Sequence, residues 1–464
     1  MDLFNVYLSA ANDFLYTYIL IILLIAAGVY FSIRTKFVQF RLIPDALQAL
    51  TEKAKGKEIS SFQALMISTA SRVGTGNIAG ITTAIIAGGP GAVFWMWIMA
   101  FIGSASAFVE STLAQIYKTK NGEEFRGGPS YYIQKALGQR WLGIIFSILL
   151  IACFAYGFNA LQSFNMSSAL EYYIPNYNNS IFPMVLGIVL AVLTGLVIFG
   201  GVHRIGFITS YIVPVMAIVY IAMGLFITFT NLDKIPAMFS AIFESAFDFK
   251  AIFGGFAGSA VLIGIKRGLF SNEAGMGSAP NAAATAEVSH PVKQGMVQVL
   301  SVFIDTVLIC TTSAFIVLLS GTDLKNGLNG IPFVQNAIQN QVGSLGIHFI
   351  TFSIFAFAFT SLIGNYCYAE SNILFIKDNK VLLNIFRVTC LMAVFFGAQA
   401  GFDTVWNLAD VLMALMAMVN IIAIFLLGRI AVKTLDDYTR QKKEKKDPIF
   451  HPKEIGIENT EAWD

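Results

Sequence analysis

Charged residues are scarce in this 464-residue sequence. Asp, Glu, Lys and Arg together make up 12% of the chain, whereas soluble domains contain about 25%. Hydrophobic residues make up 56%, and the mean hydropathy is +0.68. The net charge of +2 is too small to favour nucleic acid as a partner. This composition indicates a protein that is surrounded largely by lipid.

Cysteine and histidine are also rare, and neither forms a metal or redox pattern. Disulfides and cysteine-rich metal sites are not expected, because CxxC spacing is absent and the four cysteines lie inside apolar runs (Cys153, Cys310, Cys367 and Cys390). The four histidines lie near the ends of apolar runs or in the C-terminal tail. Neither HExxH nor GxxxxGK[ST] occurs. We therefore expect no enzyme, no ATP-driven pump and no resident cofactor.

Long apolar runs dominate what is present. A membrane span needs about 20 mainly apolar residues. The first run is predicted to be a retained span, because no basic segment precedes it as in a signal peptide. The sequence predicts an all-α integral membrane protein with about 11 transmembrane helices, at about 14–33, 62–87, 92–116, 141–166, 181–201, 206–230, 251–275, 296–320, 346–375, 381–400 and 405–430.

The basic residues of the connections predict the orientation. Lys and Arg concentrate in the loop after the first span, which includes Lys53, Lys55 and Lys57, in alternate connections after it, and in the tail. The opposite connections hold only Lys234, Lys250 and Lys325. Because cytoplasmic loops are rich in Lys and Arg, we expect the N-terminus outside and the C-terminus in the cytoplasm, in the plasma membrane. That topology requires an odd number of spans.

Two predicted spans contain helix-breaking residues. The second carries "VGTGNIAG", residues 73–80, and the seventh carries "GSAVLIGIKRGLFSNEAGMGSAP". Broken helices are tolerated where they line a cavity enclosed by protein, and a half-helix N-terminus there attracts a carboxylate. Close packing through small residues is the alternative reading of the second span.

The offset of five between these spans predicts an inverted repeat, which is typical of secondary transporters. The chain then divides into an N-terminal helix and loop (1–61), two five-helix repeats (62–230 and 251–430) and a cytoplasmic tail (431–464). The tail is expected to be solvated, with contact to anionic lipid as an alternative. The segment from Ser320 to Gly346 is expected to be an external loop with a short surface helix. An ion channel is the alternative from another class, although no repeated filter or charge ring is visible.

Several motifs resemble the alanine or glycine:cation symporter family, also called sodium:alanine symporters. They are "GGPGAVFWMWIMAFIG", "VGTGNIAG", "GGPSYYIQKALG" and "RGLFSNEAGMGSAPNAAATAE". The resemblance covers about residues 62–430. It implies a leucine-transporter-like fold and uptake of a small amino acid coupled to Na⁺ or, in some members, H⁺. The expected partners are that substrate and the lipid bilayer, without an obligate protein partner.

The resemblance also implies a substrate site and a cation site. The substrate carboxylate is expected at Thr75 and Gly76, with Gln162 facing the substrate and Asn159 nearby; either amide could instead join helices. Na⁺ is expected between the carbonyls of Ala70 and Val73 and the hydroxyls of Thr360 and Ser361. The alternative is that both hydroxyls bond their own helix backbone.

Ionisable residues inside predicted spans are functional candidates by default. Asp305 could join Asn77 at a second cation or proton site, or pair with Arg72. Glu110 and Glu370 are expected near the cytoplasmic surface as gate or structural charges. Lys266, Arg267 and Glu273 are expected to form a gating network or structural pairs.

One position departs from the family pattern and bears on the substrate. Relatives that carry alanine or glycine commonly have Trp where this sequence has Asn365, four residues after Ser361 and so on nearly the same helix face. Asn leaves more volume and adds hydrogen-bonding groups, which favours glutamine. Alternatively, a neighbouring aromatic residue fills the space, and alanine or glycine remains the substrate.

Overall fold

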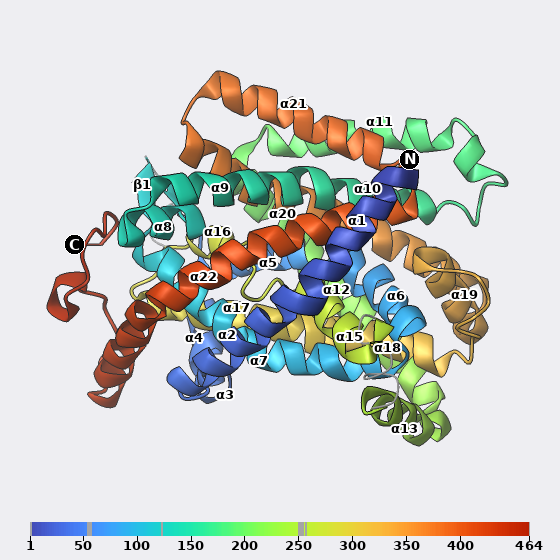
Figure 1. The fold of residues 1–464 in the computed structure, drawn as a ribbon, viewed down its shortest axis with the longest axis horizontal. Helices are drawn as coiled ribbons and strands as arrows, with labels where there is room; N and C mark the ends of the chain where they lie inside the picture. Colours follow the sequence, from blue (N-terminus) through green and yellow to red (C-terminus); the bar gives the residue numbers. More distant parts are fainter. Residues whose placement is uncertain (1, 53–57, 122–123, 249–254, 256–257, 464) are drawn as a thin grey trace.

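The protein is nearly all-helical, as expected (Figure 1). The computed structural model describes residues 2–52, 58–121, 124–248, 255 and 258–463. Lys53, Lys55, Lys57 and Lys250, together with part of the predicted seventh span, lie outside these residues. Two short strands, β1 (Thr119–Asn121) and β2 (Glu124–Arg126), pair in antiparallel orientation.

Among the described residues, eight helices are long and apolar enough to cross a membrane. Each overlaps a predicted span, and the shorter apolar helix α11 (Phe182–Ile198) overlaps the fifth. The total of eleven spans and the inverted repeat remain predictions. The eight are α1–η1–α2 (Asp2–Leu15, Tyr16–Leu20 and Ile21–Arg34), α7 (Gly91–Ile116), α9–η3–α10 (Arg140–Leu150, Ile151–Phe158 and Asn159–Ser168), α12 (Gly201–Thr230), α17–η7–α18 (Pro291–Val302, Phe303–Cys310 and Thr311–Leu319), α20 (Ser344–Ile376), α21 (Lys380–Gly397) and α22 (Phe402–Lys443).

Both predicted interruptions are present. The first separates α5 (Ser61–Arg72), the 3₁₀ turn η2 (Thr75–Asn77) and α6 (Ala79–Gly88). The second follows α15 (Ala260–Asn272) and runs to the short helix α16 (Pro280–Ala283). Glu273, Gly275 and Gly277 in this second interruption have φ values of +54°, +81° and +87°, a region in which a right-handed helix cannot continue.

The interrupted helices lie at the centre of the packing. α15 and α17 pack along α7, while α5 packs against α12 and α20. In Figure 1 the elements α8 (Pro129–Leu137), α16 and β1 lie toward the C-terminus, whereas α6, α13 (Ile235–Ala246) and α19 (Gly330–Val342) lie at the other end of the long axis. The remaining short elements are α3 (Val38–Arg41), α4 (Ile43–Leu50), η4 (Tyr177–Asn179), η5 (Leu232–Lys234) and η8 (Pro452–Ile455).

The expected short helix between residues 320 and 346 is α19, but it is not a freely exposed surface helix. Ile331, Phe333, Val334 and Ile338 are buried, and α19 packs against α20. The apolar positions of this helix recur at helical spacing, so one face joins the core.

The tail is solvated only in part, because residues 442–447 are exposed whereas the segment after them packs against the rest of the chain. α22 continues to Lys443, and the chain then folds back so that Phe450 and Ile457 are buried. The Phe450 amide donates to the Ser289 carbonyl at 3.0 Å, and Trp463 Nε1 donates to the Gln115 carbonyl at 2.8 Å. The charged stretch of residues 440–447 hid these apolar residues, which are too few and too widely spaced to give a periodic pattern.

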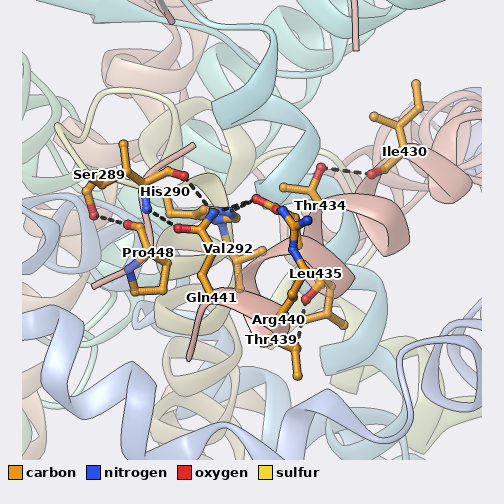
Figure 2. A network of polar contacts seen from close by, with 12 residues as sticks. Ser289, His290, Val292, Ile430, Thr434, Leu435, Thr439, Arg440, Gln441 and Pro448 are labelled. Atoms are coloured by element: carbon orange, nitrogen blue, oxygen red, sulfur yellow. Dashed lines mark hydrogen bonds and ion pairs between the residues drawn. The ribbon is translucent and has the colours of Figure 1, made fainter. Parts of the chain in front are cut away.

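His290 joins the start of α17 to α22, beside the packed tail (Figure 2). Its Nδ1 accepts a hydrogen bond from the Val292 amide at 3.3 Å, and its Nε2 lies 3.4 Å from Asp437 Oδ2. Burial lowers the pKa of His290. A neutral ring protonated on Nε2 satisfies both contacts, because Nδ1 is then the acceptor and Nε2 the donor.

The packed tail predicts different effects at two neighbouring residues. Phe450→Ala removes a buried ring that lies against His290 and Trp463, and should lower the free energy of unfolding by about 3 kcal/mol. Ile449→Ala is the matched control, because Ile449 is 52% exposed, and should change it by less than about 0.5 kcal/mol. Thermal unfolding of the purified protein in detergent measures both. Equal shifts in the two variants would contradict the packed tail.

Candidate functional site

The first interruption is closely packed against α10 and α20. The Thr75 amide donates to Gln162 Oε1 at 3.0 Å. A Cβ atom on Gly74 would lie 2.9 Å from Gln162 Nε2 and would overlap the Ser361 hydroxyl. A larger residue at position 74 would therefore have to displace these two side chains. The structure brings together Thr75, Gln162 and Ser361, three of the residues predicted for the site.

The other side of the interruption faces α15. A Cβ atom on Gly76 would lie 2.6 Å from the Phe270 ring. Phe270 in turn packs against Trp406 of α22, with ring centroids 5.3 Å apart. Gly76 thus lies where the two interrupted helices approach each other, as expected for a centre built from both.

Ser361 connects α20 to the free carbonyls at the end of α5. Its hydroxyl lies 2.9 Å from the Ala70 carbonyl oxygen and 3.4 Å from that of Val73. Both hydroxyls also contact the Phe357 carbonyl of their own helix, Ser361 at 3.0 Å and Thr360 at 2.9 Å. Three of the four predicted cation ligands are therefore adjacent, although Ser361 shares with Thr360 the backbone bond of the alternative reading.

Asn77 and Asp305 are in direct contact. Asn77 Nδ2 donates to Asp305 Oδ1 at 2.6 Å, and Asn77 Oδ1 accepts from the Gly74 amide at 3.0 Å. Asp305 also accepts from the hydroxyls of Ser271 and Thr306, at 2.6 and 2.9 Å. It belongs to the π-helical turn η7, a form of helix that is frequent at functional sites. Asp305 thereby ties the first interruption to both α15 and η7.

The alternative ion pair between Arg72 and Asp305 is not formed. Arg72 is buried, and its Nη1 donates to Gln298 Oε1 at 3.2 Å. None of the ion pairs among the described residues includes Arg72. The Arg72 Nε and Nη2 atoms have no hydrogen-bond partner among the residues that the structure describes.

Asn159 and Asn365 bond to each other. Asn365 Nδ2 donates to Asn159 Oδ1 at 3.0 Å, and Asn365 Oδ1 lies 2.6 Å from the Ser71 hydroxyl. Asn159 Nδ2 donates to Cys390 Sγ at 3.3 Å, so Asn159 also joins η3–α10 to α21. Ser71 was not identified from the sequence, where a serine near a helix end carries no distinguishing signal.

Glu110 is fully buried and lies against the second interruption. It accepts from the amides of Gly275 and Gly277 at 3.2 and 3.0 Å, and from Asn420 Nδ2 at 2.7 Å. It satisfies backbone donors that the unwound segment leaves free. Glu370 has the expected structural pairing, with Arg387 at 3.1 Å.

Lys266 and Arg267 share a carboxylate that sequence reasoning missed. Asp410 Oδ2 lies 2.7 Å from Lys266 Nζ, and Arg267 binds both Asp410 oxygens, at 3.1 and 2.9 Å. Asn12 and Tyr16 of the first span also contact this cluster. A lone Asp in the run "VWNLADVLMALM" was the available signal, since an acidic residue within a span needs a partner. Glu273 does not join this cluster.

The arrangement of the helices has known counterparts among solved structures. One is MhsT in complex with L-phenylalanine, with a TM-score of 0.58 and 12% identity, covering 82% of this chain and 96% of that one. Another is a manganese transporter of Eremococcus coleocola, with a TM-score of 0.54 and 13% identity, covering 84% and 91%. The protein is thus a membrane protein of the leucine-transporter-like fold.

Sequence relatives identify the family. The amino-acid carrier protein AlsT of Bacillus subtilis (strain 168) is 48% identical over 99% of this chain and 98% of its own length. The probable sodium/glutamine symporter GlnT of the same organism is 47% identical, covering 98% and 95%. The sodium/alanine symporter AgcS of Methanococcus maripaludis is 36% identical, covering 94% and 98%. The sodium:alanine symporter family matches residues 1–452, and the chain belongs to it. It is a transporter and not an enzyme.

The Asp410 cluster predicts a large loss of stability when its single carboxylate is neutralised. Asp410→Asn leaves Lys266 and Arg267 partly desolvated without an anion, which should cost about 3–5 kcal/mol. Asp403→Asn, on the exposed first turn of the same helix, should cost less than about 1 kcal/mol. Thermal unfolding in detergent compares the two variants. An Asp410→Asn protein as stable as Asp403→Asn would show that the cluster does not stabilise the fold.

Proposed function

We propose that the protein imports a small neutral amino acid together with Na⁺, with glutamine as the leading substrate and alanine or glycine as the alternatives. The carrying observation is the Ser361 hydroxyl between the Ala70 and Val73 carbonyls. Membership of the sodium:alanine symporter family supports Na⁺ as the coupling ion. A hard cation prefers several oxygen ligands of this kind.

In this proposal the substrate carboxylate binds the backbone of the first interruption. The Thr75 amide, now bonded to Gln162 Oε1, would donate to the carboxylate instead, beside Gly76. In this exchange a carboxylate oxygen of the substrate takes the place of the Gln162 amide oxygen. The N-terminus of a half-helix favours the carboxylate, because its free amides and its dipole attract anions. Gln162 would then face the substrate.

The cation would be held by Ala70, Val73, Ser361 and Thr360. Its entry requires the Ser361 hydroxyl to turn its hydrogen away from the carbonyls, and the Thr360 hydroxyl to leave the Phe357 carbonyl. Movement of one charge through a potential of 100 mV supplies about 2.3 kcal/mol. That free energy drives accumulation of the substrate.

Glutamine is favoured because Asn365 adds a hydrogen-bonding amide near the proposed substrate site. Its amide is bonded to Ser71 and Asn159, and a substrate amide can exchange with such bonds. The name of GlnT, a relative at 47% identity, supports the same substrate class. The name of AgcS keeps alanine as the alternative.

The proposed topology is eleven spans in the plasma membrane, with the N-terminus outside, the C-terminus in the cytoplasm and an inverted repeat of spans 2–6 and 7–11. The packed tail of residues 448–463 would then lie at the cytoplasmic end. Proton coupling through Asp305 and Asn77 is the second candidate, and their 2.6 Å contact is the observation that favours it.

Loss of the Ser361 hydroxyl should weaken cation binding selectively. Ser361→Ala is expected to raise the Na⁺ concentration for half-maximal uptake by about tenfold, equivalent to about 1.4 kcal/mol. Ser353→Ala is the matched control, because Ser353 is buried on the same helix and its hydroxyl has no partner among the described residues. Uptake into proteoliposomes at varied Na⁺ measures both. An unchanged Na⁺ requirement in Ser361→Ala would refute this cation site.

Two substitutions at Asn365 separate volume from polarity. Asn365→Trp should reduce glutamine uptake at least about tenfold and leave alanine uptake measurable, because the larger ring excludes the longer substrate. Asn365→Leu keeps the volume and removes the amide, so it should also impair glutamine if polarity matters. Competition between the two labelled amino acids is the assay. Alanine transport without any glutamine transport in the unchanged protein would remove Asn365 as the determinant.

A further inference from the structure

Glu273 occupies an unusual position that neither the substrate site nor the cation site uses. It directly follows α15, with φ +54°, a left-handed conformation that a glutamate rarely adopts. Its side chain is 1% exposed, yet it belongs to none of the ion pairs found among the described residues. A buried carboxylate without a cation must be stabilised by hydrogen-bond donors or carry a proton.

The other two central carboxylates have the donors that an ionised group needs. Glu110 accepts from two backbone amides and the Asn420 amide. Asp305 accepts from the Asn77 amide and from two hydroxyls. Among the residues that the structure describes, Glu273 has two hydroxyl neighbours, Ser278 at 2.6 Å and Ser71 at 3.1 Å. It therefore has the fewest hydrogen-bond donors of the three.

One of these two hydroxyls is contested. Ser71 has a single hydrogen, but its oxygen lies 3.1 Å from Glu273 Oε1 and 2.6 Å from Asn365 Oδ1. Asn365 continues the chain to Asn159, and Asn159 continues it to Cys390. In this arrangement each amide nitrogen donates away from Ser71, so the Ser71 hydrogen goes to Asn365. The remaining contact then requires Glu273 itself to donate, which only a protonated carboxyl can do.

The chain has a second arrangement that is also fully bonded. If Glu273 loses its proton to solvent, Ser71 donates to the carboxylate. The Asn365 amide then turns and donates to Ser71, the Asn159 amide turns and donates to Asn365, and the Cys390 thiol donates to Asn159. Every bond is kept and its direction reversed. The protonation of Glu273 therefore determines whether Asn365 directs its amide oxygen or its amide nitrogen toward Ser71, and which of the two it directs toward Asn159.

The ionisable groups that face Glu273 come from four other elements. They are Arg72 of α5, Asp305 of η7, Tyr368 of α20 and Cys153 of η3. Arg72 favours the anion, whereas Asp305 disfavours it. The Tyr368 hydroxyl lies near Ser71 and makes no hydrogen bond to Glu273, so it does not supply Glu273 with a third donor.

We propose that Glu273 is a proton-binding site, distinct from the Na⁺ ligands, whose occupancy orients the Asn365 amide through Ser71 and so tunes the affinity for a substrate with a polar side chain. The link to substrate rests on the proposed function, whereas the bound proton does not. The proton comes from solvent and returns to it. It is held in the conformation described here and need not be the coupling ion.

Infrared difference spectroscopy of the purified protein tests the proton directly. The wild type should show the carbonyl band of a buried protonated carboxyl group, shifted in D₂O. Glu273→Gln should lose that band, whereas Asp305→Asn and Glu370→Gln should keep it. A wild-type protein without the band, or a Glu273→Gln protein that retains it, would overturn the proposal whatever the substrate is.

Substrate binding across pH tests the coupling. Gln at position 273 can donate to Ser71 and accept from Ser278, so Glu273→Gln should bind glutamine with a pH-independent Kd equal to the acid plateau of the wild type. In the wild type this Kd should change at least threefold between acid and alkaline pH, while the Kd for alanine should not. Ser71→Ala should retain the infrared band but lose the pH dependence. Identical pH profiles in wild type and Glu273→Gln would refute the coupling, and binding of neither amino acid would instead refute the proposed function.

Discussion

The structure depends on how two interrupted helices satisfy their backbone away from water. Hydrocarbon cannot bond free amides and carbonyls, so an unwound segment must find every partner within the protein. At the first interruption the partners are Gln162, Asn77 and Ser361. At the second, Glu110 and Asn420 bind the segment around Gly275. The backbone amides and carbonyls that lack a partner within their own helix are also the groups that a substrate or an ion can bind.

Buried charge follows from the same constraint. Ionisable groups lie buried around both interruptions, and these groups are stabilised in different ways. Asp410 neutralises Lys266 and Arg267 by direct pairing. Glu110 and Asp305 rely on three hydrogen-bond donors each. Glu273 has two hydroxyl contacts and no ion pair within the described chain, and in our proposal a bound proton compensates it.

The long helices and both interruptions were predictable from the sequence, because a membrane span requires a long apolar run and an intact helix. Apolar runs located the long helices, and glycines within them located both interruptions. The pairing of Asn365 with Ser71 and Asn159 was not predictable, since residues 71, 159 and 365 meet only through tertiary packing. The packed tail was missed because few apolar residues, such as Phe450 and Trp463, stand among charged ones. The Arg72 to Gln298 contact likewise depends on packing, since depth alone suggested Asp305 as its partner.

The most direct test of the account is uptake of radiolabelled glutamine into proteoliposomes, first with an inward Na⁺ gradient and then with a proton gradient in the absence of Na⁺. The account predicts concentrative uptake with Na⁺, an increase when the interior is made negative, and none with protons alone. Uptake that a proton gradient drives equally well without Na⁺ would contradict the assignment of the Ser361 site as the coupling site.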